Sequence, residues 1–145
     1  MNRLLRPLPA SGQHLALLVA RVLVGVVLVA HGWQKLDEYT LDGTAASFEE
    51  MGVPAARAAA TFAAFAELGG GALLIVGLLT PVAALLVALN MAGAWYYGHR
   101  GTGIFVAEGG GELVMVIGAV VLAIAATGAG RFSLDAILQR RATAR

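Results

Sequence analysis

The chain has 145 residues, of which 59% are hydrophobic and only 13% are charged, and its mean hydropathy is +0.78. Soluble domains are about half apolar, so this composition favours a protein whose solvent is the lipid bilayer. The formal net charge of +1 gives no reason to expect a nucleic-acid partner. The chain has no cysteine, which excludes disulfides and iron–sulfur clusters ligated by its own side chains.

Four apolar runs follow one another, and each is long enough to cross the hydrocarbon layer, which takes about 20 helical residues. We predict these helices at residues 13–35, 55–78, 81–98 and 108–127. The first run is longer than the apolar part of a secretory signal and contains Arg21, so we interpret it as a transmembrane helix. The predicted fold class is therefore all-α, an integral membrane four-helix bundle that occupies residues 1–145 as a single domain.

The segment between the first two runs, residues 37–53, is polar and acidic. Thr44 is a candidate N-cap, Phe48 and Met51 share one side, and Gly52 is a candidate stop. We predict a short helix here that lies at the membrane surface.

The second and third runs are separated by a tight turn, in which Thr80 can cap the third helix and Pro81 can start it. These two helices are therefore expected to be antiparallel neighbours. After the fourth run, Ser133 is a candidate N-cap, and residues 133–142 form an amphipathic pattern. We predict a tail helix that lies on the membrane surface, with its arginines among the lipid headgroups.

Basic residues gather at the two ends of the chain, whereas acidic residues dilute those on the opposite face. The arginines at the ends are Arg3, Arg6, Arg131, Arg140, Arg141 and Arg145. Cytoplasmic loops are enriched in Lys and Arg, so we expect both the N and C termini to be cytoplasmic. An even number of crossings is consistent with this orientation.

Charged groups inside a membrane need partners, because each costs at least ~2.5 kcal/mol near the centre of the bilayer. On the first helix, Arg21, Gly25, Leu28, Gly32 and Lys35 form one stripe, which should face the interior of the bundle.

Depth, counted at ~1.5 Å per residue from the outer end of each helix, places Arg21, Glu67 and Asn90 in one layer near the middle of the membrane. We therefore predict an Arg21–Glu67 ion pair whose hydrogen bonds are completed by Asn90. A second, shallower layer consists of His31, Lys35, His99 and Glu112. The two layers would form a polar funnel that opens to the outer side and narrows to the pair.

Structural roles compete with these site roles. Arg21 and Glu67 could serve only to fix helix register, and Asn90 fits interhelical hydrogen bonding better than ligand binding. Lys35 could extend to the interface. No metal site is predicted, since the histidines and glutamates lack a tight ligand spacing. We interpret the aromatic residues as an interfacial belt rather than a cofactor box: Trp33, Trp95, Tyr96 and Tyr97.

Four segments stand in order along the chain: "RVLVGVVLVAHGWQKL", "FEEMGVP", "AELGGGALLIVGLLTPVAAL" and "GRFSLD". Together they resemble the DoxX family of small four-helix bacterial membrane proteins. The first is similar to the family's Arg, Gly and Gly-x-x-Lys pattern, and the last to its closing Gly-Arg-aromatic-Ser-Leu-Asp. The resemblance covers nearly the whole chain, and it is looser in the third helix and the loop after it.

This resemblance implies a multi-pass protein of the bacterial inner (plasma) membrane. Some relatives are similar to the small subunits of an archaeal thiosulfate:quinone oxidoreductase, and a mycobacterial member is associated with a membrane complex concerned with oxidative stress. We therefore predict a membrane subunit of an oxidoreductase or redox-stress complex that contacts the lipid bilayer and other subunits. Without cysteine, the chain is not expected to catalyse thiosulfate oxidation alone.

The predicted ligand of the funnel is a quinone-like or small anionic molecule, and a quinone is the candidate cofactor. Glu67 and Arg21 are the candidate catalytic residues. The candidate ligand-binding residues are Lys35, His31, Asn90, His99 and Glu112. The alternative function is a non-catalytic membrane anchor, or assembly subunit, that recruits redox partner proteins.

Overall fold

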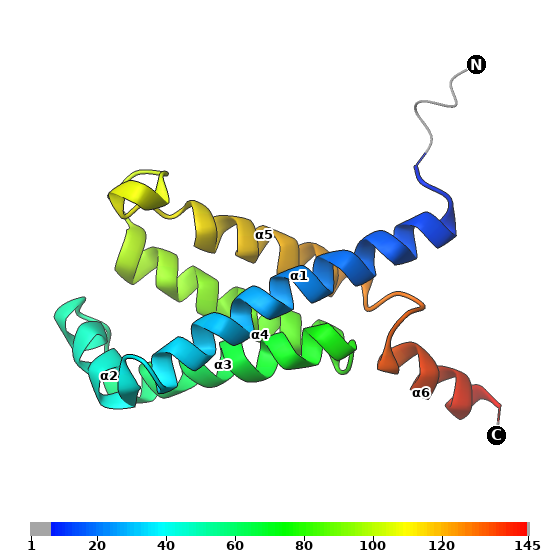
Figure 1. Cartoon of the computed structure of the whole chain (residues 1–145), viewed down its shortest axis with the longest axis horizontal. Helices are drawn as coiled ribbons and strands as arrows, with labels where there is room; N and C mark the ends of the chain where they lie inside the picture. Colours follow the sequence, from blue (N-terminus) through cyan, green and yellow to red (C-terminus); the bar gives the residue numbers. More distant parts are fainter. Residues whose placement is uncertain (1–6, 145) are drawn as a thin grey trace, which may run out of the picture.

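The computed structural model describes residues 7–144, in which every regular element is a helix and there is no strand (Figure 1). This part of the chain has six α-helices: α1 (Ala10–Leu36), α2 (Thr40–Glu50), α3 (Ala56–Val76), α4 (Thr80–Ala94), α5 (Glu112–Thr127) and α6 (Leu134–Thr143). Two short irregular helices lie between α4 and α5, the π-helix η2 (Trp95–His99) and the 3-10 helix η3 (Val106–Glu108).

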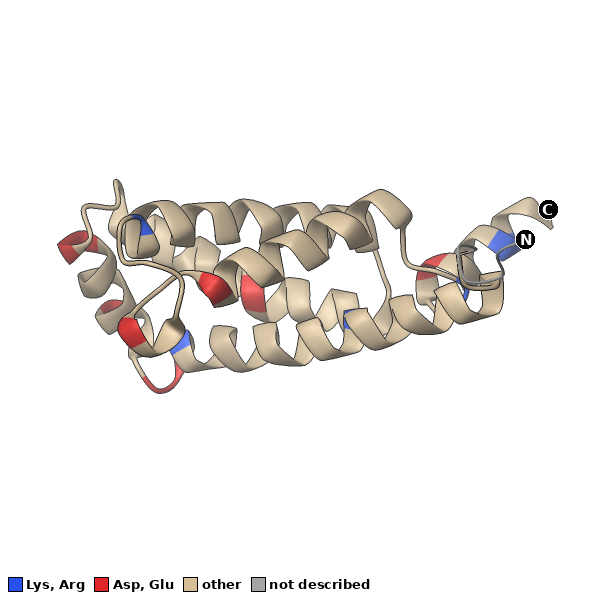
Figure 2. Ribbon diagram, turned by 90° about the horizontal axis from the view of Figure 1, so that it is seen from above, with Lys and Arg blue, Asp and Glu red and all other residues tan. Residues whose placement is uncertain are grey.

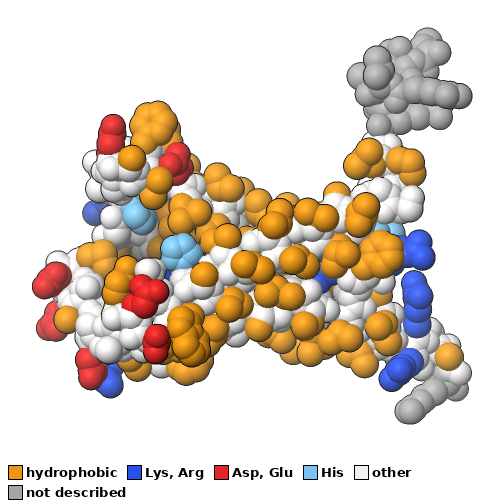
Figure 3. Space-filling view, in the orientation of Figure 1, with side chains coloured by type: hydrophobic (Ala, Val, Ile, Leu, Met, Phe, Trp, Pro, Cys, Tyr) orange, Lys and Arg blue, Asp and Glu red, His pale blue; other side chains and the backbone are white. Residues whose placement is uncertain are grey.

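Two of these helices, α1 and α3, are long and apolar enough to cross a membrane, and α5 is a shorter apolar helix. The long helices between the two ends of the molecule are covered by hydrophobic side chains (Figure 3). Leu23, Leu89 and Val116, from three different helices, each leave more than 60% of their area exposed, at 63%, 64% and 61%. A surface of this kind is stable against lipid but not against water.

The long helices run along the same axis (Figure 2). α1 packs along α3, α3 packs against α4, and α4 packs against α5, whereas α1 and α5 make much less contact. α2 lies across one end of the molecule, against α3 and α1. The start of α1 and the end of α6 both lie at the opposite end (Figure 1).

Two glycines of α1 set its register against α3. A Cβ on Gly32 would lie 2.4 Å from the Leu68 backbone nitrogen, and a Cβ on Gly25 would lie 2.7 Å from the Gly71 carbonyl oxygen. The two backbones therefore touch at both points. This contact explains why the stripe predicted on the first helix is buried: Arg21, Gly25, Leu28 and Gly32 all face the interior.

Helix ends differ from the expected ones at two threonines. Thr44 lies inside α2, where its hydroxyl donates to the Lys35 and Thr40 carbonyl oxygens, both at 3.0 Å, instead of capping the helix. Thr80 is the first residue of α4 and its side chain makes no cap. The predicted cap by Ser133 is confirmed, because its oxygen accepts from the Ala136 backbone N–H at 3.2 Å.

The two ends of the molecule differ in charge (Figure 3). Acidic side chains gather near α2 and the α4–α5 connection, and basic side chains lie at the α6 end. Arg131 comes shortly before α6, and Arg140 and Arg141 are in its last turn. Arg3, Arg6 and Arg145, which also contributed to the predicted orientation, lie outside the described residues.

Candidate functional site

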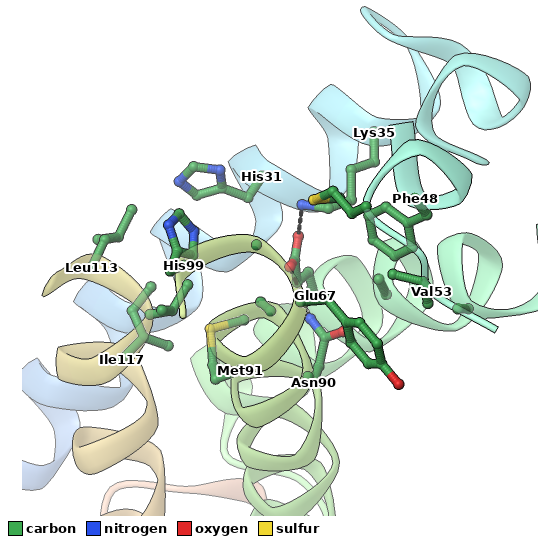
Figure 4. Close-up of a pocket in the computed structure, with 18 of the residues that line it drawn as sticks. His31, Lys35, Phe48, Val53, Glu67, Asn90, Met91, His99, Leu113 and Ile117 are labelled. Carbon is green, nitrogen blue, oxygen red and sulfur yellow. Dashed lines mark hydrogen bonds and ion pairs between the residues drawn. The ribbon is translucent and has the colours of Figure 1, made fainter. Parts of the chain in front are cut away.

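A cavity of about 560 Å³ lies at the α2 end, between α1, α3, α4 and α5 (Figure 4). Its walls are mostly apolar, and one side is closed by Phe48 of α2 and by Met51, which directly follows α2. The weak contact between α1 and α5 leaves room for this space. A cavity of this volume is large enough for a small organic ligand.

Three polar side chains meet in this cavity. Lys35 Nζ, from the last turn of α1, lies 2.6 Å from Glu67 Oε2 in the middle of α3. The other oxygen, Glu67 Oε1, accepts from Asn90 Nδ2 of α4 at 2.9 Å. Glu67 is only 4% exposed, so its charge depends on these two donors. The prediction that Lys35 faces the interior and that Asn90 hydrogen-bonds Glu67 is therefore confirmed.

Two histidines line the same cavity, and Figure 4 shows them across the cavity from Phe48 and Val53. His31 is on α1 and His99 is the last residue of η2. His99 Nδ1 lies 2.9 Å from the Gly109 carbonyl oxygen, which can only accept. This contact keeps the proton of a neutral His99 ring on Nδ1 and leaves Nε2 as the acceptor.

The π-helix η2 contributes to the cavity wall. Tyr97, Gly98 and His99 are consecutive in the chain and all three line the space. Wide turns of this kind often occur at functional sites. Of the four aromatic residues interpreted as a belt, Trp33, Trp95 and Tyr96 are exposed, whereas Tyr97 also lines the cavity.

The predicted Arg21–Glu67 ion pair is wrong. Arg21 is fully buried, but its Nη1 donates to the Leu74 carbonyl oxygen at 2.8 Å and its Nη2 to the Phe132 carbonyl oxygen at 2.7 Å. It therefore joins α1 to the end of α3 and to the segment before α6. The carboxylate of Glu67 pairs with Lys35 instead.

The physical reason is helix register. Counting depth from the helix ends assumed that α1 and α3 end at the same level, but the contact at Gly32 places Leu68 beside the last turn of α1. The first part of α3, before Glu67, therefore extends beyond the end of α1, and α2 packs against it there. At 1.5 Å per residue, Arg21 lies about 21 Å from Lys35 along the helix axis, toward the start of α1.

Two residues of the predicted funnel do not line the cavity. Arg21 lies toward the other end of the molecule, and Glu112 Oε1 accepts from the Val106 backbone N–H at 2.9 Å, which holds the loop before α5. Within residues 7–144 there is no group of three His, Cys, Asp or Glu side chains that could hold a metal ion.

Sequence reasoning missed the role of Asp135. Its Oδ1 accepts from the Leu79 N–H at 2.8 Å and its Oδ2 from the Thr80 N–H at 2.9 Å, so it caps α4 from another helix. Its own N–H donates to the Gly77 carbonyl oxygen at 2.9 Å. The residue stands in the "GRFSLD" segment, whose pattern places it in the first turn of the tail helix but gives no sign of its contact with α4.

The fold and the site together define an all-helical membrane protein with a charged pair inside an apolar cavity. The DoxX family model matches residues 16–100, which include Lys35, Glu67 and Asn90. The chain belongs to the DoxX family.

Two relatives with similar sequences are membrane proteins by name. The chain is 34% identical over 136 residues to the uncharacterized membrane protein Rv3486 of Mycobacterium tuberculosis, covering 86% of this chain and 82% of the relative. It is 30% identical over 134 residues to the inner membrane protein YqjF of Escherichia coli, covering 89% of this chain and 96% of the relative. No solved structure matches the chain.

Proposed function

We propose that the chain is the membrane subunit of a quinone-linked oxidoreductase or redox-stress complex, and that it holds a quinone-like headgroup in the cavity at the α2 end. The observation that carries this proposal is the buried Lys35–Glu67–Asn90 cluster inside apolar walls. A quinone has the same two-part character, because polar oxygens stand on an otherwise apolar ring and tail.

The cluster offers both kinds of hydrogen bond that such a ligand needs. The ammonium of Lys35 can donate to a carbonyl oxygen of the oxidised ring, and the carboxylate of Glu67 can accept from a hydroxyl of the reduced ring. His31 and His99 line the same wall, where an imidazole can accept and pass on the proton. In this proposal the electrons come from a redox protein of the complex, because a chain without cysteine has no thiol redox chemistry and ligates no iron–sulfur cluster through its own side chains.

We propose that four helices cross the inner membrane and that both ends of the chain are cytoplasmic. α4 continues directly into η2, which lengthens this third apolar segment beyond the α-helix itself. The cavity then lies toward the outer side. The arginines at the α6 end support this orientation, because cytoplasmic flanks are enriched in basic residues.

Quinone binding tests the proposal directly. The protein is purified in mild detergent, its organic extract is analysed for quinones by mass spectrometry, and a short-chain ubiquinone analogue is titrated while tryptophan fluorescence is followed. We expect saturable binding that Glu67→Gln weakens at least tenfold. Glu49→Gln, which changes an exposed carboxylate of α2, should leave it unchanged.

No co-purified quinone together with equal titrations for the wild type and Glu67→Gln would refute the proposal. The anchor function would then be favoured if a Lys35→Leu, Glu67→Leu double variant still co-purifies with its partner proteins.

A further inference from the structure

A second cavity, of about 370 Å³, lies at the opposite end of the molecule from Lys35 and Glu67. It is bounded by His14 near the start of α1, by Pro81 at the start of α4, by the connection after α5, and by Ala136 and Gln139 of α6. Four separate parts of the chain converge here, although no part of the proposed function uses this space.

The charge around this cavity is positive. Arg131 lines it, and Arg140 and Arg141 stand exposed in the last turn of α6. The acidic lining residue, Asp135, is the single acidic residue between 113 and 145, and both its oxygens already accept backbone N–H groups. The segments 1–36 and 68–107 contain no acidic residue at all. A bound anion would therefore meet little repulsion.

The cavity also contains a polar atom without a partner. His14 Nδ1 is buried and makes no hydrogen bond within residues 7–144. A buried polar atom of this kind costs free energy unless a ligand or water satisfies it. The side-chain amide of Gln139 lines the same space and can donate as well.

The helices that bound this cavity also expose apolar side chains. Leu134, Ile137 and Leu138 of α6 are 41%, 46% and 52% exposed, so α6 leaves its apolar side uncovered by the rest of the chain. On α1, Leu15 is 55% exposed. A ligand with a charged head and long hydrocarbon chains would contact both the basic cavity and these side chains.

We propose that this cavity binds the phosphate headgroup of an anionic glycerophospholipid in the cytoplasmic leaflet. Arg131 neutralises the phosphate, His14 and Gln139 donate hydrogen bonds to it, and the acyl chains lie along α1 and the apolar side of α6. Asp135 ties α6 to the α3–α4 turn, so it fixes the outer wall of the cavity.

Lipid titrations of the purified full-length protein test this site. Binding of phosphatidylglycerol and of phosphatidylcholine is counted by native mass spectrometry, and the melting temperature is followed in parallel. We expect tighter binding of phosphatidylglycerol and a larger thermal stabilisation by it. Arg131→Gln should weaken phosphatidylglycerol binding about fivefold, the effect of removing roughly 1 kcal/mol for one basic residue at a membrane surface.

Two controls make the result specific. Arg100→Gln removes an exposed arginine at the other end of the molecule, where it lies over the Tyr96 ring, and should leave lipid binding unchanged. Equal melting temperatures of the wild type and Arg131→Gln in phosphatidylcholine would show that the variant is folded.

Three results would overturn the proposal. The first is equal binding of the two lipids. The second is a loss of phosphatidylglycerol binding in the Arg140→Gln, Arg141→Gln double variant that is as large as the loss in Arg131→Gln. That result would indicate a diffuse effect of charge rather than binding in the cavity. The third is Arg131-dependent stabilisation by inorganic phosphate alone to the same extent, which would identify a free anion as the ligand.

Discussion

Glu67 is the residue on which the cavity at the α2 end depends. Its carboxylate is almost fully buried, and Lys35 and Asn90 occupy its two oxygens from two other helices. A buried pair contributes little net stability when it is intact, but the loss of one partner leaves an uncompensated charge. The Lys35 side chain is 19% exposed and that of Glu67 is 5% exposed. If Glu67 is removed, the Lys35 ammonium can therefore turn toward water. If Lys35 is removed, the Glu67 carboxylate stays buried.

This asymmetry gives a prediction for single and double variants. We expect Lys35→Leu to lower the free energy of unfolding by about 3 kcal/mol and Glu67→Leu by less, while the double variant recovers most of the loss. Chemical unfolding in mild detergent measures all four members of the cycle. Purely additive losses would show that the two side chains do not interact in the folded protein.

Gly32 is the second residue whose identity is fixed by packing. A Cβ there would meet the backbone nitrogen and Cα of Leu68 at 2.4 and 2.8 Å, and neither atom can rotate away. We expect Gly32→Ala to lower the free energy of unfolding by about 1–3 kcal/mol. Gly69→Ala is the matched control: nothing lies within 4 Å of its Cβ, so the better helix propensity of alanine should keep or raise stability. Equal effects on thermal unfolding would contradict the close contact between α1 and α3.

At the scale of the elements, the segment before α6 and the first turn of α6 are tied to the end of the helical core, although α6 itself buries no residue. Arg21 donates to the Phe132 carbonyl oxygen, and Asp135 caps α4 while its N–H bonds to Gly77. Gly77 has a φ of +69°, and a Cβ on it would lie 2.3 Å from Arg21 Nη1. The α3–α4 turn, α1 and α6 therefore stabilise one another.

The capping by Asp135 predicts a dependence of stability on pH. Burial favours the neutral form of Asp135, but the hydrogen bonds from Thr80 and Leu79 and the charge of Arg21 outweigh it, and the pKa of Asp135 lies below its usual value. In the unfolded chain this carboxyl titrates near its ordinary pKa of about 3.9. The stabilisation of the folded protein by the Asp135 carboxylate is therefore fully present above about pH 4. It is lost as the pH falls through the lower pKa that Asp135 has in the folded state.

We expect Asp135→Asn to be less stable than the wild type by about 1 kcal/mol at pH 7, and this difference to narrow at pH 3. Thermal unfolding at the two pH values measures it. Asp37→Asn, at an exposed position beyond α1, serves as the control and should change little. A difference between Asp135→Asn and the wild type that stays constant with pH would show that the carboxylate charge is not involved.

At the scale of the whole molecule, the separation of charge between its two ends sets the expected orientation in the membrane. Acidic residues of α2 lie at one end and the arginines of α6 at the other, and the surface of the long helices between them is apolar (Figures 2 and 3). The two cavities lie at these opposite ends, so they would face different compartments.

Single cysteines test this orientation, since the chain has none of its own. We expect a membrane-impermeant maleimide added to intact cells to label Glu49→Cys and Glu108→Cys but not Ala142→Cys. All three positions are exposed. Labelling of Ala142→Cys before lysis, or of none of the three until lysis, would contradict the proposed topology.

The helical fold, the apolar surface, the family and the inward-facing stripe of α1 could all be predicted from the sequence, because composition, periodicity and motifs act over one helix at a time. The sequence also identified Lys35, Glu67 and Asn90 as polar residues that need partners. Only the tertiary structure decided which partners they have. Axial register depends on close contacts at Gly25 and Gly32, and the capping of α4 depends on Asp135, 55 residues away from Thr80. Such contacts join distant parts of the chain, so no local pattern specifies them.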